Sequence, residues 1–87
     1  MDRKELFVKF KEPVVNSLNG ILKCQFNVHA SVGLGINANN QLDYSFTVVG
    51  AQPKDKAKIK LTIEKITAQI VPQSKPCVNF TNQPRAF

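Results

Sequence analysis

The most regular pattern in the chain is an alternation of apolar and polar positions across residues 24–36. A period of two is typical of a β-strand that buries one face and exposes the other. The outer face of this strand would carry His29, Ser31 and two glycines. We therefore expect residues 24–36 to be the strand around which the domain packs, with these inward side chains: Cys24, Phe26, Val28, Ala30, Val32, Leu34 and Ile36.

A second alternating segment, residues 42–48, follows the turn-prone sequence NANNQ at 37–41. Asparagine tolerates the left-handed backbone that tight turns need. The two segments therefore predict an antiparallel hairpin, and Gly33 and Gly35 on its outer face indicate a bulge or curl. The expected facing pairs are Ile36 with Leu42, Leu34 with Tyr44, and Val32 with Phe46.

Residues 2–23 admit two interpretations. One is a single long amphipathic helix, because apolar residues recur at intervals of three and four. Pro13 counts against it, since proline removes a helical hydrogen bond and disfavours helical backbone at Glu12. We therefore prefer a break: a first piece ending near Lys11, either edge strand or helical turn, and then a helix from Pro13 to Lys23. The apolar stripe of the single long helix would be Phe7, Phe10, Val14, Leu18 and Ile21. The stripe of the shorter helix would be Val14, Val15, Leu18, Ile21 and Leu22.

Residues 58–64 alternate again, which predicts a third strand with Ile59, Leu61 and Ile63 facing inward. The alternation changes phase at Ile66, so we expect one extra residue to be absorbed as a bulge near position 64 or 65. Residues 72–87 contain three prolines, which favour an extended C-terminal arm over a central strand.

Together these elements predict an α+β fold: an N-terminal amphipathic helix packed on a three- to four-stranded antiparallel sheet, with an extended C-terminal arm. Residues 1–71 would form a single domain and residues 72–87 the arm. The expected core consists of Val14, Leu18, Leu22, Phe26, Val28, Val32, Leu34, Tyr44, Phe46, Val48, Ile59, Leu61 and Ile63.

Composition adds charge and compartment to this picture. Twelve Lys and Arg against six Asp and Glu give a formal net charge of +6, which suits an acidic partner or solubility alone. The N-terminus is charged from its second residue, which favours a cytoplasmic protein or a mature product without its leader. No apolar run approaches membrane-span length. Cys24 and Cys77 could pair or remain plain thiols.

Residues with the spacing of a catalytic or metal site are lacking in the sequence. The single histidine, His29, would lie on the outer sheet face, and Ser31 beside it has only ordinary strand spacing. Cys24, His29 and Cys77 are not clustered as metal ligands are. We therefore expect a protein that is not an enzyme and has no metal, no cofactor and no small-molecule substrate.

The recurring lysines and the apolar residues of the arm are the candidate binding residues. Lysines at every second position would form one patch beside the third strand, able either to dock phosphates or to guard a strand edge against wrong pairing. We favour the second role. The candidate partner-binding residues are Lys54, Lys56, Lys58, Lys60, Val78, Phe80 and Phe87.

The segment SFTVVGAQPKDKAKIKLTIEKI resembles the closing hairpin of the small bacterial trypsin-co-occurring domain. The matching positions are Val48, Val49, Gly50, Ala51 and Ile59 to Ile63, about a third of the chain together with their surroundings. The resemblance implies an α+β helper or adaptor module of bacterial conflict systems, without catalytic residues.

Function is therefore expected to lie in binding. The favoured hypothesis is a small non-catalytic protein-interaction module that binds a protein partner, or self-associates, through a sheet edge or the C-terminal arm. The alternative is a nonspecific nucleic-acid-binding protein that uses the lysine patch. No membrane partner is expected.

Overall fold

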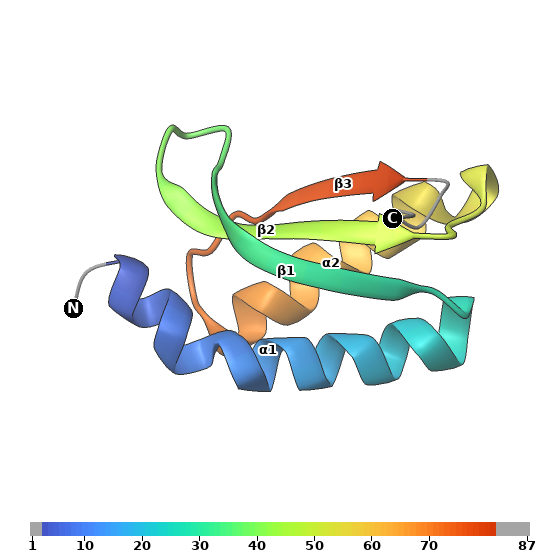
Figure 1. The fold of residues 1–87 in the computed structure, drawn as a ribbon, viewed down its shortest axis with the longest axis horizontal. Coiled ribbons are helices and arrows are strands. Elements are labelled where there is room, and N and C mark those ends of the chain that lie inside the picture. Colours follow the sequence, from blue (N-terminus) through green and yellow to red (C-terminus); the bar gives the residue numbers. More distant parts are fainter. Residues whose placement is uncertain (1–2, 82–87) are drawn as a thin grey trace, which may run out of the picture.

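The computed structural model describes residues 3–81 as two helices on a small sheet (Figure 1). The sheet has the strand order β1-β2-β3, with β1 antiparallel and β3 parallel to β2. The α+β class is thus confirmed, but the sheet is mixed rather than antiparallel. The elements are α1 (Arg3–Phe26), β1 (His29–Ile36), β2 (Leu42–Val49), the 3-10 turn η1 (Pro53–Asp55), α2 (Lys56–Ile70) and β3 (Cys77–Thr81).

The hairpin of β1 and β2 has the expected register. Ile36 lies opposite Leu42, Leu34 opposite Tyr44, and Val32 opposite Phe46. A Cβ atom added to Gly35 would lie 2.9 Å from Cβ of Ser45, closer than real side chains approach. Glycine at this position therefore allows the strands to come together.

Helix α1 runs without interruption through Pro13, so the predicted break near Lys11 is wrong. A proline inside a helix costs about 3 kcal/mol because one hydrogen bond is lost. Burying an aliphatic side chain gains about 1.5–3 kcal/mol. The three fully buried residues Val14, Leu18 and Leu22 on one side of α1 therefore outweigh the proline.

The strand predicted over residues 24–36 begins only at His29, because Cys24 and Phe26 belong to the last turns of α1. Asn27 ends the helix in the left-handed conformation, with a φ of 55°. Its N–H donates to the carbonyl of Lys23 at 3.1 Å, as in the αL helix cap. The chain then turns directly into β1.

The third strand predicted around Ile59–Ile63 is instead helix α2. Ile59, Ile63, Ile66 and Ile70 are spaced by four, three and four residues, which is one side of a helix. The change of phase that suggested a bulge is therefore the mark of a helical period. Leu61 points away from the sheet and is 65 % exposed.

The core lies between the helices and the sheet face that carries the even-numbered residues of β1 and β2. Nine of the expected core residues are buried, while Phe26 and Val32 are partly buried against them. Leu34 is 39 % exposed, so it and Leu61 are corrections to the predicted core. The buried nine are Val14, Leu18, Leu22, Val28, Tyr44, Phe46, Val48, Ile59 and Ile63.

Residues 77–81 of the expected arm form β3, which pairs with β2 of the same sheet. The arm's last residues, including Phe87, lie outside the described range. Within residues 3–81, neither helix combines the length and the apolar character that crossing a membrane requires.

Candidate protein-binding edge

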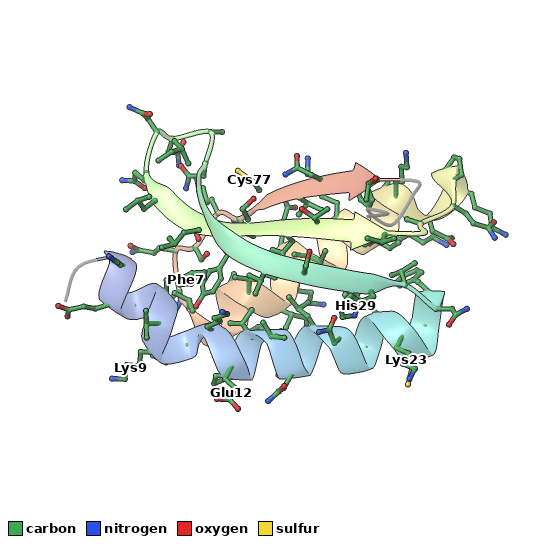
Figure 2. All side chains as sticks on the ribbon, in the orientation of Figure 1. Phe7, Lys9, Glu12, Lys23, His29 and Cys77 are labelled. Carbon is green, nitrogen blue, oxygen red and sulfur yellow. The ribbon has the colours of Figure 1, made fainter. Side chains whose placement is uncertain are left out.

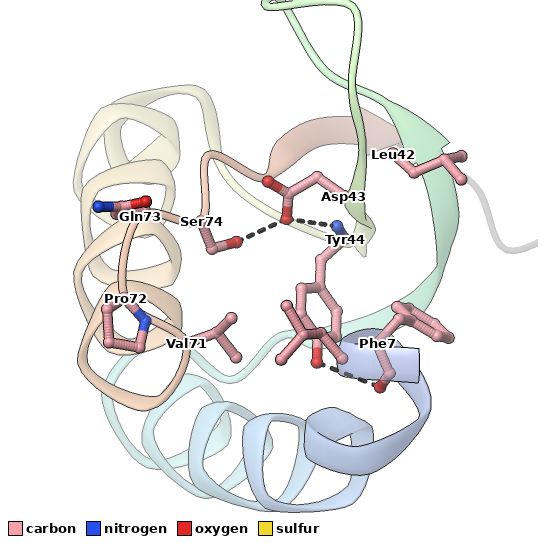
Figure 3. Close-up of a pocket in the computed structure, with 9 residues that line it drawn as sticks. Phe7, Leu42, Asp43, Tyr44, Val71, Pro72, Gln73 and Ser74 are labelled. Carbon is pink, nitrogen blue, oxygen red and sulfur yellow. Dashed lines mark hydrogen bonds between the residues drawn. The ribbon is translucent and has the colours of Figure 1, made fainter. Parts of the chain in front are cut away.

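Asp43 is a buried carboxylate that fastens the start of β3 to the sheet. Its Oδ1 accepts hydrogen bonds from Ser74 Oγ at 2.5 Å and from the N–H of Tyr44 at 2.7 Å (Figure 3). Its Oδ2 accepts from the N–H of Lys75 at 2.8 Å and from Asn37 Nδ2 at 3.2 Å. Because donors surround both oxygens, this carboxylate is a structural clasp.

A cavity of about 240 Å³ lies beside this clasp, between the first turns of α1, the start of β2 and residues 71–74 (Figure 3). The Tyr44 hydroxyl donates to the carbonyl of Phe7 at 3.2 Å, and the two rings are 4.8 Å apart. Burial, and then the charge of Asp43, raise the pKa of Tyr44. The phenol therefore stays neutral and acts as a strut between α1 and β2.

β3 is an edge strand of the described sheet, and the Asp43 clasp fixes its position. The carbonyl of Thr81 accepts from the N–H of Gly50, so the main-chain groups of Thr81 point toward β2. Successive residues of a strand point their N–H and C=O groups to opposite sides. The N–H and C=O groups of Val78 and Phe80 are consequently directed at the free edge.

A groove of about 620 Å³ follows this free edge. We call it the edge groove. The α2 side contributes Lys60 and Glu64, and the β3 side contributes Lys75, Cys77, Val78 and Asn79. Farther along β3, the Lys56 ammonium nitrogen lies 5.6 Å from the centroid of the Phe80 ring. Three lysines therefore border a strip of main-chain donors and acceptors.

The predicted patch of four lysines is divided by the helix. Lys56 and Lys60 are one helical turn apart on the side of α2 that faces β3. Lys58 is two residues from each, which turns it about 200° away from them on an α-helix. Lys54 lies in η1, before the helix. Of the four, Lys60 therefore lines the edge groove, and Lys56 lies farther along β3, beside the Phe80 ring.

Val78 and Phe80 contribute differently from the expectation. Their side chains are half-buried and pack against the core, so they are not free apolar anchors. Their main-chain groups are what the edge exposes. Glu64 was missed because only the helical period of residues 56–70 places α2 along β3. Lys75 was missed because its position depends on the long-range bond from its N–H to Asp43.

The other edge of the sheet, β1, is partly occupied by α1. The N–H of Ala30 donates to Asn19 Oδ1 at 3.4 Å. A helix side chain thus takes one of the main-chain donors that a strand partner of β1 would use. This contact makes β3 the better edge for an incoming strand.

The remaining candidates for chemistry are dispersed. His29 is exposed at the start of β1, and Cys77 lies across the sheet near the start of β3 (Figure 2). Cys24 and Cys77 are both free thiols, and Cys77 Sγ donates to the carbonyl of Ile36 at 3.2 Å. Within residues 3–81 no three metal-binding side chains come together.

Comparison of the chain with protein-family models, curated proteins and solved structures finds no match.

Proposed function

We propose that this protein is a small, non-catalytic interaction module that takes up an extended segment of a partner protein as an additional strand beside β3. The observation that carries the proposal is the free edge of β3, where the main-chain groups of Val78 and Phe80 face outward and the edge groove lies beside Val78. In strand addition, main-chain hydrogen bonds supply affinity and the side chains on either face supply specificity.

Self-association through β3 is the less favourable form of this proposal. A second copy would bring its own Lys56, Lys60 and Lys75 to the same edge, and like charges would meet. Nucleic acid is also less favoured, because the helix separates Lys58 from Lys56 and Lys60. The resemblance to the trypsin-co-occurring domain stays a prediction, and its matching positions Ile59 to Ile63 are helical here.

The test begins with a displayed library of short random linear peptides selected against the native protein. Peptides that bind are then synthesised, and amide hydrogen exchange is measured by NMR with and without each peptide. We expect binding to slow exchange at Val78 and Phe80, while the amide of Asn79, which faces β2, is protected in both states. Protection that develops at β1 or on the helices would contradict the proposal.

A matched pair of variants tests the main-chain contact. Val78→Pro removes one outward N–H from an edge position where proline is tolerated, whereas Val78→Ala keeps the N–H and shortens the side chain. We expect peptide affinity to fall about tenfold in Val78→Pro and little in Val78→Ala, because an interface hydrogen bond is worth about 0.5–1.5 kcal/mol. Melting curves show whether each variant is folded, and equal affinities in folded variants would overturn the proposal.

A further inference from the structure

We infer, building on the proposed function, that the segment taken up beside β3 is acidic at alternate positions, with the two carboxylates paired to Lys56 and Lys60. Both lysines project from the side of α2 that borders β3, one beside the Phe80 ring and one in the edge groove beside Val78. Neither has an ion-pair partner among residues 3–81. Their charges are therefore available to an incoming segment.

The spacing of the two lysines fits a strand. Four residues of α-helix rise about 6 Å. Side chains two residues apart on one face of a strand are about 6.6 Å apart. An Asp or Glu at positions i and i+2 of an added strand would therefore meet Lys56 and Lys60 in turn, with the intervening side chain on the opposite face of the sheet.

The far end of the edge groove has mixed charge. Glu64 and Lys75 both border it there, so that end favours neither sign. The acidic preference should consequently be confined to the positions facing Lys56 and Lys60. Because α2 and β3 run in opposite directions, the position facing Lys56 lies beside Phe80 and the position facing Lys60 lies beside Val78.

The main chain of β3 also favours a peptide over a nucleic acid. Val78 and Phe80 present carbonyl acceptors as well as N–H donors at the free edge. A peptide backbone satisfies both kinds of group, whereas the DNA phosphodiester backbone supplies acceptors and no donors. Phosphates placed there would leave the carbonyls unpaired.

The test compares two double variants with equal loss of charge. Lys56→Gln/Lys60→Gln removes the two lysines on the side of α2 that borders β3, and Lys58→Gln/Lys65→Gln removes two exposed lysines elsewhere on α2. Peptides selected on the native protein should be enriched in Asp or Glu at positions i and i+2. Replacing both acids by their amides should weaken binding about tenfold, because two exposed ion pairs are lost.

The Lys56→Gln/Lys60→Gln variant should bind the acidic and amide peptides equally, while the control variant should keep the preference. Lys56→Glu/Lys60→Glu should instead prefer peptides with Lys or Arg at those positions. Peptides that protect Val78 and Phe80 from exchange without any acidic preference would overturn this inference and leave the proposed function in place. Failure of every selected peptide to protect that edge would overturn both.

A titration with nucleic acid completes the test. Single-stranded and duplex DNA oligonucleotides are titrated against the native protein at several salt concentrations. We expect weak binding that does not displace the acidic peptide. Tight binding that competes with the peptide, falls steeply with salt and is lost in Lys56→Gln/Lys60→Gln would overturn the inference in favour of phosphate recognition.

Discussion

Replacing Asp43 by Asn should destabilise the protein strongly although the two side chains have the same shape. The carboxylate accepts hydrogen bonds from Ser74 Oγ, Asn37 Nδ2 and the N–H groups of Tyr44 and Lys75. An amide has one acceptor oxygen, so its NH₂ group must face two of these donors. Ser74 can turn its hydroxyl to accept, but the N–H of Tyr44 cannot.

The expected loss follows from these contacts. One buried N–H is left unpaired, and the bonds to Asn37 and Lys75 lose a charged acceptor. Leaving a buried donor unpaired costs about 1–3 kcal/mol, and hydrogen bonds to charged groups are stronger than neutral ones. We expect the free energy of unfolding to fall by about 2–3 kcal/mol, which lowers the melting temperature of a domain this small by about 10–20 °C.

Urea denaturation followed by circular dichroism measures this loss. Asp55→Asn is the control for charge, because Asp55 makes no side-chain cap to α2 and should change stability by less than about 1 kcal/mol. Hydrogen exchange should also quicken in β3, which the clasp holds in place. Equal stabilities of Asp43→Asn and Asp55→Asn would refute the assignment of Asp43 as a structural clasp.

Two further predictions concern buried hydroxyl groups. The folded protein raises the pKa of Tyr44 above its ordinary value of 10.0, so above about pH 10 the unfolded chain loses this proton first and stability should fall as pH rises. Tyr44→Phe should flatten this alkaline decline in stability. Absorbance titration follows the phenol directly, because the chain has one tyrosine and no tryptophan. An ordinary pKa of Tyr44 in that titration would contradict the prediction. Thr67 is fully buried and its hydroxyl has no hydrogen-bond partner within residues 3–81. Thr67→Val should therefore raise the free energy of unfolding by about 1 kcal/mol in urea denaturation, and a destabilised variant would show that the hydroxyl is bonded in solution.

The hairpin could be predicted residue by residue because its determinants are local. Alternation assigns the two faces, and the short asparagine-rich turn places Ile36 opposite Leu42. The end of α1 could also have been found from a local signal, since Asn27 follows the last helical turn and asparagine is a common residue there.

Helix α2 could not be assigned by the same means. Ile59, Leu61 and Ile63 satisfy a period of two, and Ile59, Ile63 and Ile66 satisfy a helical period. Isoleucine and threonine favour strands by local propensity, which supported the wrong choice. Helical packing buries Ile59 and Ile63 completely and exposes Leu61, and this distribution is visible only once the sheet is present.

The candidate site depended on the same decision. With residues 58–64 as a strand and Lys54 and Lys56 in the loop before it, the lysines would have formed one patch. As helix α2, residues 56–70 place Lys56 and Lys60 along β3 and turn Lys58 away. The clasp at Asp43 was likewise hidden, because Ser74 and Lys75 are 31 and 32 residues away in sequence.

The sequence by itself therefore determined the class of fold, the hairpin with its register, and most of the buried positions, because these follow from apolar periodicity over short distances. The tertiary structure alone decided that α1 continues through Pro13, that residues 56–70 are helical, and that β3 pairs in parallel with β2. Each of these choices has a local cost or a local ambiguity. The free energy gained by burying side chains against elements distant in the sequence decides each choice, and a short segment by itself does not provide that free energy.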